Sequence, residues 1–125
     1  MNATLLVMAG GALGAAGRYH LGRVIFHFCG AGFPYGTLAA NLIGGFLMGV
    51  LAGGLARSDF VDEPWRLFLG VGLLGGFTTF SAFSLEVMNM IERGEWTTAV
   101  GYALLSVVGS VLALFAGLIT MRAFA

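Results

Sequence analysis

The residues best suited to chemistry in this chain are hydroxyls gathered in one short apolar stretch, residues 75–84 (GGFTTFSAFS). The stretch carries two adjacent glycines, Gly75 and Gly76, and four hydroxyl side chains within the next eight residues. Lipid offers no hydrogen-bond partner, so polar or non-helical backbone at membrane depth occurs only where it is buried in protein or lines a watery cavity. If the surrounding segment spans a membrane, this cluster predicts a pathway through it.

The composition indicates a membrane protein. Hydrophobic residues make up 58% of the 125 residues, and 21 more are Gly, whereas a soluble domain is about half apolar with Gly included. Charged residues are only 10%, with six arginines balanced by six acids. This balance gives no reason to expect nucleic acid or an acidic substrate as a partner. The lone Cys29 cannot form an intramolecular disulfide.

Four segments reach the roughly 20 residues that a membrane-spanning helix needs. They cover about residues 3–28, 35–56, 67–91 and 97–121. Tyr35, Trp65 and Trp96 lie at the predicted helix ends, where amphipathic rings favour the headgroup region. The sequence therefore predicts an all-α membrane protein, with residues 1–125 forming a single four-helix transmembrane domain.

The arginines are nearly balanced across the membrane. With four spans, one side holds Arg57, Arg66 and Arg122, and the other holds Arg23 and Arg93, with Arg18 about a turn deeper. Orientation follows the Lys/Arg bias of short loops, so near balance predicts insertion in both orientations. Opposite copies would then pair as an antiparallel homodimer, the two-chain version of an inverted repeat. The alternative is that a subtler signal fixes one orientation.

Glycines recur at four-residue spacing on several predicted helices, as at Gly45, Gly49 and Gly53 or at Gly10 and Gly14. Small residues at this spacing let helix backbones approach closely in lipid. They predict a tight bundle and say nothing of function.

Polar residues inside the predicted spans suggest function by default, because each is expensive there. The second helix carries Thr37 and Asn41, the third carries the hydroxyl cluster and Glu86, and the fourth carries Tyr102, Ser106 and Ser110 at four-residue spacing. Together they predict one continuous hydrogen-bonding route. Two alternatives are open: the hydroxyls bond their own i−4 carbonyls, or Asn41 joins helices instead of lining a pore.

The predicted lining favours an anion. Its donors are neutral hydroxyls and an amide, and Glu86 is the only deep acid. Phe80 and Phe83, three residues apart, are expected on one side of the third helix, and an aromatic edge carries partial positive charge. Ring edges beside hydroxyl and amide donors would suit a small, hard anion. The alternative for this Phe pair is core packing.

At these residues the sequence resembles the CrcB/Fluc fluoride channel family over nearly its whole length. Three stretches carry the resemblance: residues 10–19 (GGALGAAGRY), 36–46 (GTLAANLIGGF) and 75–83 (GGFTTFSAF). The departures are Ala40, where Val is common, and Ala82, where Thr or Ser is common.

The resemblance implies a dual-topology homodimer with a broken third helix and two antiparallel pores, which passively exports fluoride across the bacterial inner membrane. The implied ion-pathway residues are Asn41, Thr37, Thr79, Phe80, Ser81, Phe83, Tyr102, Ser106 and Ser110. The implied vestibule residues are Glu86 and Arg18.

The resemblance also implies a structural sodium ion, held by the backbone carbonyls of Gly75 and Thr78 at the helix-three break. An unwound turn at Gly75-Gly76 is physically reasonable because glycine has weak helix propensity and the threonines that follow can bond locally. Carbonyls freed by the break in two copies would form an oxygen cage at the two-fold axis.

A passive pore needs no energy coupling and no catalytic group, so the sequence predicts neither an enzyme nor a pump. Two alternatives are a small multidrug-resistance-type exporter and a non-transporting scaffold subunit. The exporter needs a Glu in the first helix, and residues 3–28 contain none. The scaffold leaves the hydroxyl cluster unexplained.

Overall fold

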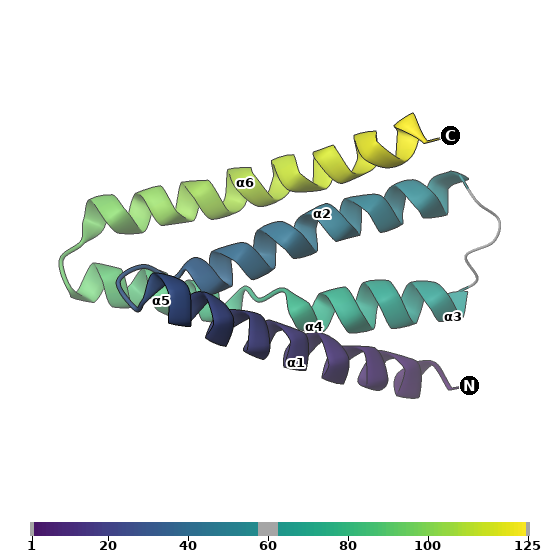
Figure 1. Cartoon of the computed structure of the whole chain (residues 1–125), viewed down its shortest axis with the longest axis horizontal. Coiled ribbons are helices and arrows are strands. Elements are labelled where there is room, and N and C mark those ends of the chain that lie inside the picture. Colours follow the sequence, from purple (N-terminus) through teal and green to yellow (C-terminus); the bar gives the residue numbers. More distant parts are fainter. Residues whose placement is uncertain (1, 58–62, 125) are drawn as a thin grey trace.

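The computed structural model describes residues 2–57 and 63–124, and within these ranges it contains helices and connecting turns but no β-strand. The elements in chain order are α1 (Ala3–Cys29), α2 (Tyr35–Arg57), α3 (Glu63–Trp65), the π-helix η1 (Arg66–Leu74), α4 (Gly75–Phe77), α5 (Ser81–Glu92) and α6 (Trp96–Ala123). Helices α1, α2 and α6 begin and end within two residues of the predicted ranges. Both chain termini lie at one end of the elongated molecule, and the α1–α2 and α5–α6 connections lie at the other (Figure 1).

Local chemistry sets the helix ends. The Asn2 side chain accepts a hydrogen bond from the Thr4 N–H at 2.7 Å, which caps the start of α1. After α1, Gly30 adopts φ +74°, and its N–H donates to the Phe26 carbonyl at 2.8 Å. Gly94, with φ +79°, makes the corresponding turn between α5 and α6. Both positions require the left-handed region that glycine enters at little cost.

The third segment is interrupted, but not where the glycine pair predicts. Gly75 and Gly76 remain helical in α4, and the helix continues unbroken through Phe77. The chain leaves the helix at Thr78, which is extended at φ −86° and ψ 159°. The prediction that Gly75-Gly76 unwinds is therefore wrong. A Cβ on Gly76 would lie 2.6 Å from the Gly11 carbonyl oxygen, so tight packing against α1 explains why this position suits glycine.

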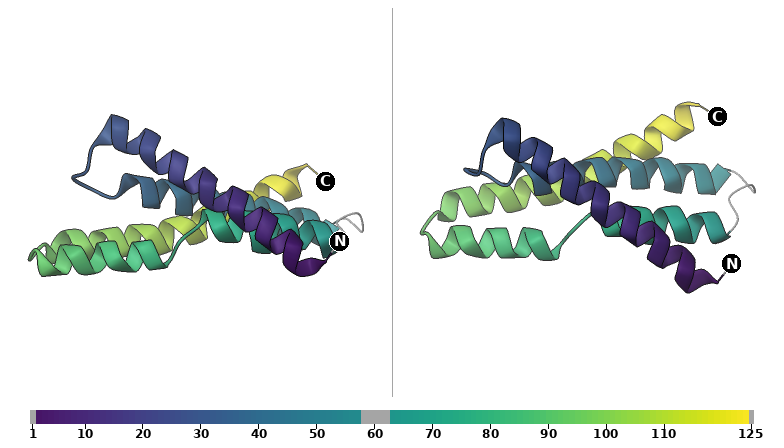
Figure 2. Two further views of the ribbon diagram at one scale, coloured as in Figure 1. Left: turned by 90° about the horizontal axis from the view of Figure 1, so that it is seen from below. Right: turned by 60° about the horizontal axis from the view of Figure 1, so that its bottom comes forward.

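Two close helix pairs hold the bundle together, and glycines form both contacts. Helix α6 runs beside α2, and α1 crosses η1 and α4 (Figures 1 and 2). A Cβ on Gly45 of α2 would lie 2.9 Å from the Ser110 carbonyl oxygen of α6, and one on Gly72 of η1 would lie 3.0 Å from the Gly10 Cα of α1. Larger side chains would force the helices apart, so the predicted packing role of the glycines is confirmed at these crossings.

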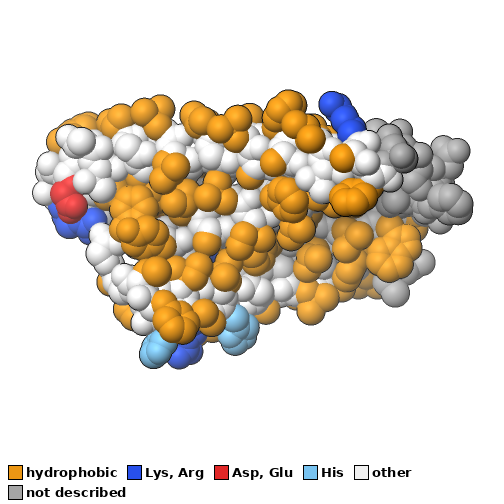
Figure 3. Space-filling view, turned by 45° about the horizontal axis from the view of Figure 1, so that its top comes forward, with side chains coloured by type: hydrophobic (Ala, Val, Ile, Leu, Met, Phe, Trp, Pro, Cys, Tyr) orange, Lys and Arg blue, Asp and Glu red, His pale blue; other side chains and the backbone are white. Residues whose placement is uncertain are grey.

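The surface is that of a multi-pass membrane protein. Among the described residues, three helical segments are long and apolar enough to cross a membrane: Tyr35–Gly54, Arg66–Glu92 and Trp96–Ala123. Hydrophobic side chains cover much of the face shown in Figure 3. A small core of buried Leu38, Phe83, Met90, Ala99 and Tyr102 joins α2, α5 and α6. This core lies beside the polar groups described next.

Candidate functional site

Asn41 of α2 holds the break in the third segment through two hydrogen bonds. Its Nδ2 donates to the Thr79 carbonyl at 3.0 Å, and its Oδ1 accepts from the Thr79 N–H at 2.8 Å. The side-chain amide thereby substitutes for the helical partners that Thr79 lacks at the break. Asn41 thus joins α2 to the third segment. Helix joining was one of the two roles that the sequence left open for this residue. Since Nδ2 carries two hydrogens, this contact occupies only one of them.

The threonines complete the ends of the broken helix. Thr78 donates through both its N–H and its Oγ1 to the Leu74 carbonyl, each at 3.0 Å. The Thr79 Oγ1 accepts from the Ala82 N–H at 3.1 Å and so caps the start of α5.

These contacts leave two backbone carbonyls without their usual helical donors. In a continuous helix the Gly75 and Thr78 carbonyls would accept from the N–H groups of Thr79 and Ala82. Those two N–H groups bond the Asn41 and Thr79 side chains instead. The backbone chemistry at Gly75 and Thr78 therefore fits a hard cation that takes oxygen ligands.

A cavity of about 430 Å³ lies between the break, α2 and α6. Its polar lining is Asn41, Thr78, Thr79, Ser106 and Ser110, and its remaining lining is apolar and includes Phe80 and Phe83. Ser106 is only 6% exposed, and its Oγ has no hydrogen-bond partner among the described residues. The i−4 alternative therefore fails for Ser106, but it holds for Thr78, whose Oγ1 donates to the Leu74 carbonyl. A buried hydroxyl without a partner calls for an explanation, and a bound water or ion is one.

Phe80 and Phe83 lie together but in different surroundings. Their ring centroids are 5.6 Å apart at an interplanar angle of 47°. Phe80 is 76% exposed, whereas Phe83 is 9% exposed and packs 5.2 Å from the Tyr102 ring. Both rings line the cavity, so Phe83 belongs to the core and the cavity at once, while Phe80 contributes little to the core.

Glu86 forms a second polar cluster with Thr37 and Tyr102. Its carboxylate accepts from the Thr37 hydroxyl at 2.9 Å and from the Tyr102 hydroxyl at 3.0 Å. A pocket of about 350 Å³ lies here, and its lining includes Glu86, Thr37, Asn89 and Arg93.

The structure thus divides the predicted route into two clusters, one at the break and one at Glu86. Phe83 of the first cluster contacts the ring of Tyr102, which bonds Glu86 in the second. Ser81 belongs to neither lining. It is exposed at the start of α5, with its Oγ 3.4 Å from the Thr79 Oγ1.

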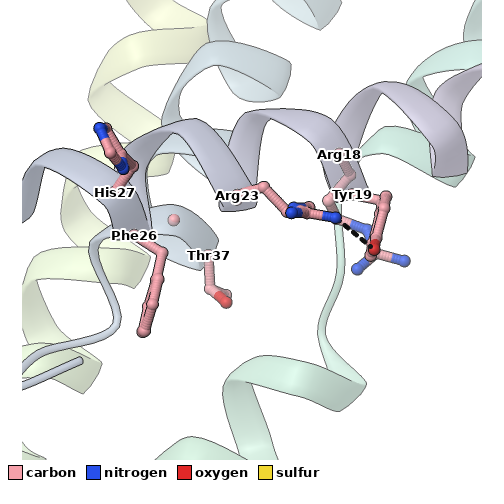
Figure 4. A pocket seen from close by; sticks show the side chains of 8 residues that line it. Arg18, Tyr19, Arg23, Phe26, His27 and Thr37 are labelled. Atoms are coloured by element: carbon pink, nitrogen blue, oxygen red, sulfur yellow. Dashed lines mark hydrogen bonds between the residues drawn. The ribbon is translucent and has the colours of Figure 1, made fainter. Parts of the chain in front are cut away.

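Arg18 lies on α1, and its Nε donates to the Gly76 carbonyl at 3.5 Å, close to the break. It lines a pocket of about 660 Å³ together with Tyr19, Arg23 and His27 (Figure 4). Sequence reasoning did not assign these last three residues a site. The spacing of Tyr19, Arg23 and His27, each four residues on, was the available signal.

Comparisons with known proteins identify the family of this chain. Residues 5–118 match the model of the family described as CrcB-like protein, Camphor Resistance (CrcB). A protein of Phenylobacterium zucineum named fluoride-specific ion channel FluC is 61% identical over 98% of this chain and 97% of its own length. Proteins with the same name from Caulobacter vibrioides (51% identity, 98% and 97% covered) and Novosphingobium aromaticivorans (54%, both chains fully covered) are also similar. With the match spanning nearly the whole chain, the protein belongs to the CrcB-like family.

Proposed function

We propose that this protein is a passive, fluoride-selective ion channel that exports fluoride from the cytoplasm. The observation that carries the proposal is the buried Ser106 hydroxyl, which makes no hydrogen bond to a described residue and lines a cavity shared with Phe80 and Phe83. The relatives that are named fluoride-specific ion channels, at 51–61% identity over nearly the full length, identify fluoride as the ion.

The cavity supplies what a small anion needs when it loses water. Ser106 and Ser110 present hydroxyls, and Asn41 retains one N–H beyond its bond to Thr79. Ring edges of Phe80 and Phe83 carry partial positive charge. A selectivity filter must replace the hydration shell that it removes, and closely placed donors do this better for fluoride than for the larger chloride. Thr79 and Ser81 extend the polar surface at the break.

The second cluster is the other part of the pathway. The hydroxyls of Thr37 and Tyr102 both donate to Glu86, so a hydrogen-bonded group stands beyond the Phe83 ring. We assign Glu86 to the vestibule at this end and Arg18 to a separate vestibule on α1.

The driving force needs no coupling site. Hydrogen fluoride crosses membranes as a neutral weak acid and ionises inside. A negative-inside potential, worth about 2.3 kcal/mol per charge per 100 mV, then drives the anion out through a selective pore. Such a channel performs no catalytic step.

We further propose that the chain spans the bacterial inner membrane four times and works as an antiparallel homodimer with two pores. Helix α1 has 27 residues, a length of about 40 Å at 1.5 Å per residue, which is enough to cross. The nearly balanced arginines support dual insertion.

We also propose that a structural sodium ion binds at the two-fold axis, beside the break in the third segment. It is supported by the Gly75 and Thr78 carbonyls, whose usual donors bond elsewhere, and by the exposure of Gly75 on the single chain. Replacing sodium by a large organic cation should then lower the stability of the dimer. An unchanged dimer would contradict this assignment.

Efflux from liposomes that contain only this purified protein tests the function. Fluoride should leave loaded vesicles quickly and chloride hardly at all. Equal chloride efflux would refute fluoride selectivity. Efflux of neither anion would favour a scaffold subunit, and proton-driven uptake of organic cations would favour a multidrug exporter.

A further inference from the structure

Gly44 of α2 lies against the break in the third segment, and its missing side chain leaves room for Thr78. Gly44 is buried and comes three residues after Asn41, so the two residues share one side of α2. A Cβ on Gly44 would overlap the Cγ2 methyl of Thr78 and would lie 3.5 Å from Cδ2 of Phe77. Helix α2 therefore contacts the break at two points, through the hydrogen bonds of Asn41 to Thr79 and through the close contact at Gly44.

The contact at Gly44 differs from the glycine contacts that pack the bundle. Several of those glycines face the backbone of another helix, as Gly45 faces the Ser110 carbonyl oxygen. Gly44 instead faces the methyl end of a single side chain, that of Thr78. A side chain can often turn aside for a new neighbour, so the effect of a larger residue depends on how firmly Thr78 is held.

The Thr78 side chain is fixed in one orientation. Threonine is branched at Cβ and stiff about χ1. Its Oγ1 donates to the Leu74 carbonyl at 3.0 Å, while its Cγ2 lies against Gly44. Either of the other two staggered rotamers would carry Oγ1 away from the Leu74 carbonyl, because the substituents on Cβ turn together. A side chain at position 44 would therefore break this hydrogen bond or push α2 away from the break.

Both outcomes would disturb the geometry that the proposed channel uses. Moving α2 away until the new contact reached an ordinary 3.4 Å or more would stretch the bonds between Asn41 and Thr79, which are 2.8 and 3.0 Å long. Turning Thr78 would release the side chain that ties the last extended residue to the helix before it. We propose that Gly44 is a positioning residue, which seats the Thr78 methyl and so keeps the break aligned with Asn41 in the cavity that these residues line.

A double-mutant cycle with Gly44→Ala and Thr78→Ser tests the proposal. Serine lacks the methyl but keeps the hydroxyl that bonds Leu74. In the native background, Gly44→Ala should lower fluoride efflux from proteoliposomes by about tenfold, the effect of one lost hydrogen bond. In the Thr78→Ser background, the same substitution should change efflux by about twofold at most. An equal loss in both backgrounds would overturn the proposal, because the alanine methyl would then act by narrowing the cavity.

Hydrogen exchange at the Thr79 N–H gives a second measurement, made by NMR on the purified protein in detergent. This N–H donates to the Asn41 side chain. Its exchange should be faster in Gly44→Ala and should return towards the native rate when Thr78→Ser is added. Unchanged exchange in Gly44→Ala would overturn the proposal. The effect on efflux rests on the proposed channel function, whereas the effect on exchange does not, so a native protein that conducts no fluoride would refute the function and leave this measurement decisive.

Gly54→Ala is the matched control, because Gly54 lies on the same helix and its Cβ would make only an ordinary contact, 3.5 Å from Cε of Met121. Efflux and Thr79 exchange should match the native values, and the thermal midpoint should be no lower, because alanine favours the helix more than glycine does. Equal effects of Gly44→Ala and Gly54→Ala would contradict the proposal. If Gly44→Ala does not fold, recovery of folded protein by Thr78→Ser would support the proposal, and a failure to recover it would count against it.

Discussion

Ser106→Ala should separate stability from transport. The Ser106 Oγ is buried and makes no hydrogen bond to a described residue. An unsatisfied buried hydroxyl costs about 1–3 kcal/mol, and alanine removes that cost with little change of volume. The variant should therefore be as stable as the native protein, or up to about 1 kcal/mol more stable after the small void is counted.

The same substitution should impair conduction. If the hydroxyl donates to the passing anion, its loss removes a hydrogen bond to a charged group, worth about 1.5–3 kcal/mol. At about 1.4 kcal/mol per tenfold change, occupancy of the site should fall by about ten- to a hundredfold. Fluoride efflux from proteoliposomes, followed with a fluoride electrode at low fluoride concentration, should fall accordingly.

Ser84→Ala is the matched control, since Ser84 is exposed on α5 and lines none of the three pockets described. It should change neither the thermal midpoint nor the efflux rate. The reasoning fails if Ser106→Ala lowers the midpoint by several degrees while efflux stays within twofold of native. The hydroxyl would then have a structural partner and no contact with the ion.

Three further predictions concern the ring pair Phe80 and Phe83, the hydrogen bonds of Asn41 at the break, and the topology. Phe80→Ile and Phe83→Ile should both slow fluoride efflux, but only Phe83→Ile should lower the thermal midpoint, because Phe83 is 9% exposed and Phe80 is 76% exposed. Normal efflux in both variants would return the pair to core packing. Asn41→Ala, which removes two hydrogen bonds to Thr79, should destabilise the protein by about 1–3 kcal/mol and slow fluoride efflux. An unchanged thermal midpoint would show that these two hydrogen bonds do not stabilise the fold. Adding three lysines after the C-terminus should force one orientation and abolish efflux, and an oppositely biased partner should restore it; full activity from one orientation would refute the antiparallel dimer.

The sequence predicts the helices well because the membrane leaves few choices. A span needs about 20 apolar residues, and the bounds of α2 and α6, which both contain a membrane-capable segment, follow from that requirement. The hydroxyl cluster likewise locates the interruption, which falls at Thr78. The assignment of Gly75-Gly76 to the break is wrong because glycine has two uses, weak helix propensity and close packing. Only the neighbouring Gly11 backbone decides between them.

The sequence predicts which residues form the candidate site better than it predicts how those residues are arranged. Four-residue spacing puts Tyr102 and Ser106 on one face of α6, but the spacing does not show that Phe83 packs on the Tyr102 ring and that Glu86 accepts its hydroxyl. The contact of Asn41 with Thr79 joins residues 38 apart in the chain. Such contacts depend on how distant helices meet, and no local pattern records them.

The placement of both termini at one end of the molecule restricts how the gene could be duplicated in tandem (Figure 1). Two copies joined by a short linker would have to insert in the same orientation, since the linker cannot cross the bilayer. A single polypeptide carrying two opposed copies would need an additional spanning segment of about 20 residues between them. An engineered fusion with such a connecting helix would fix the ratio of the two orientations at one to one.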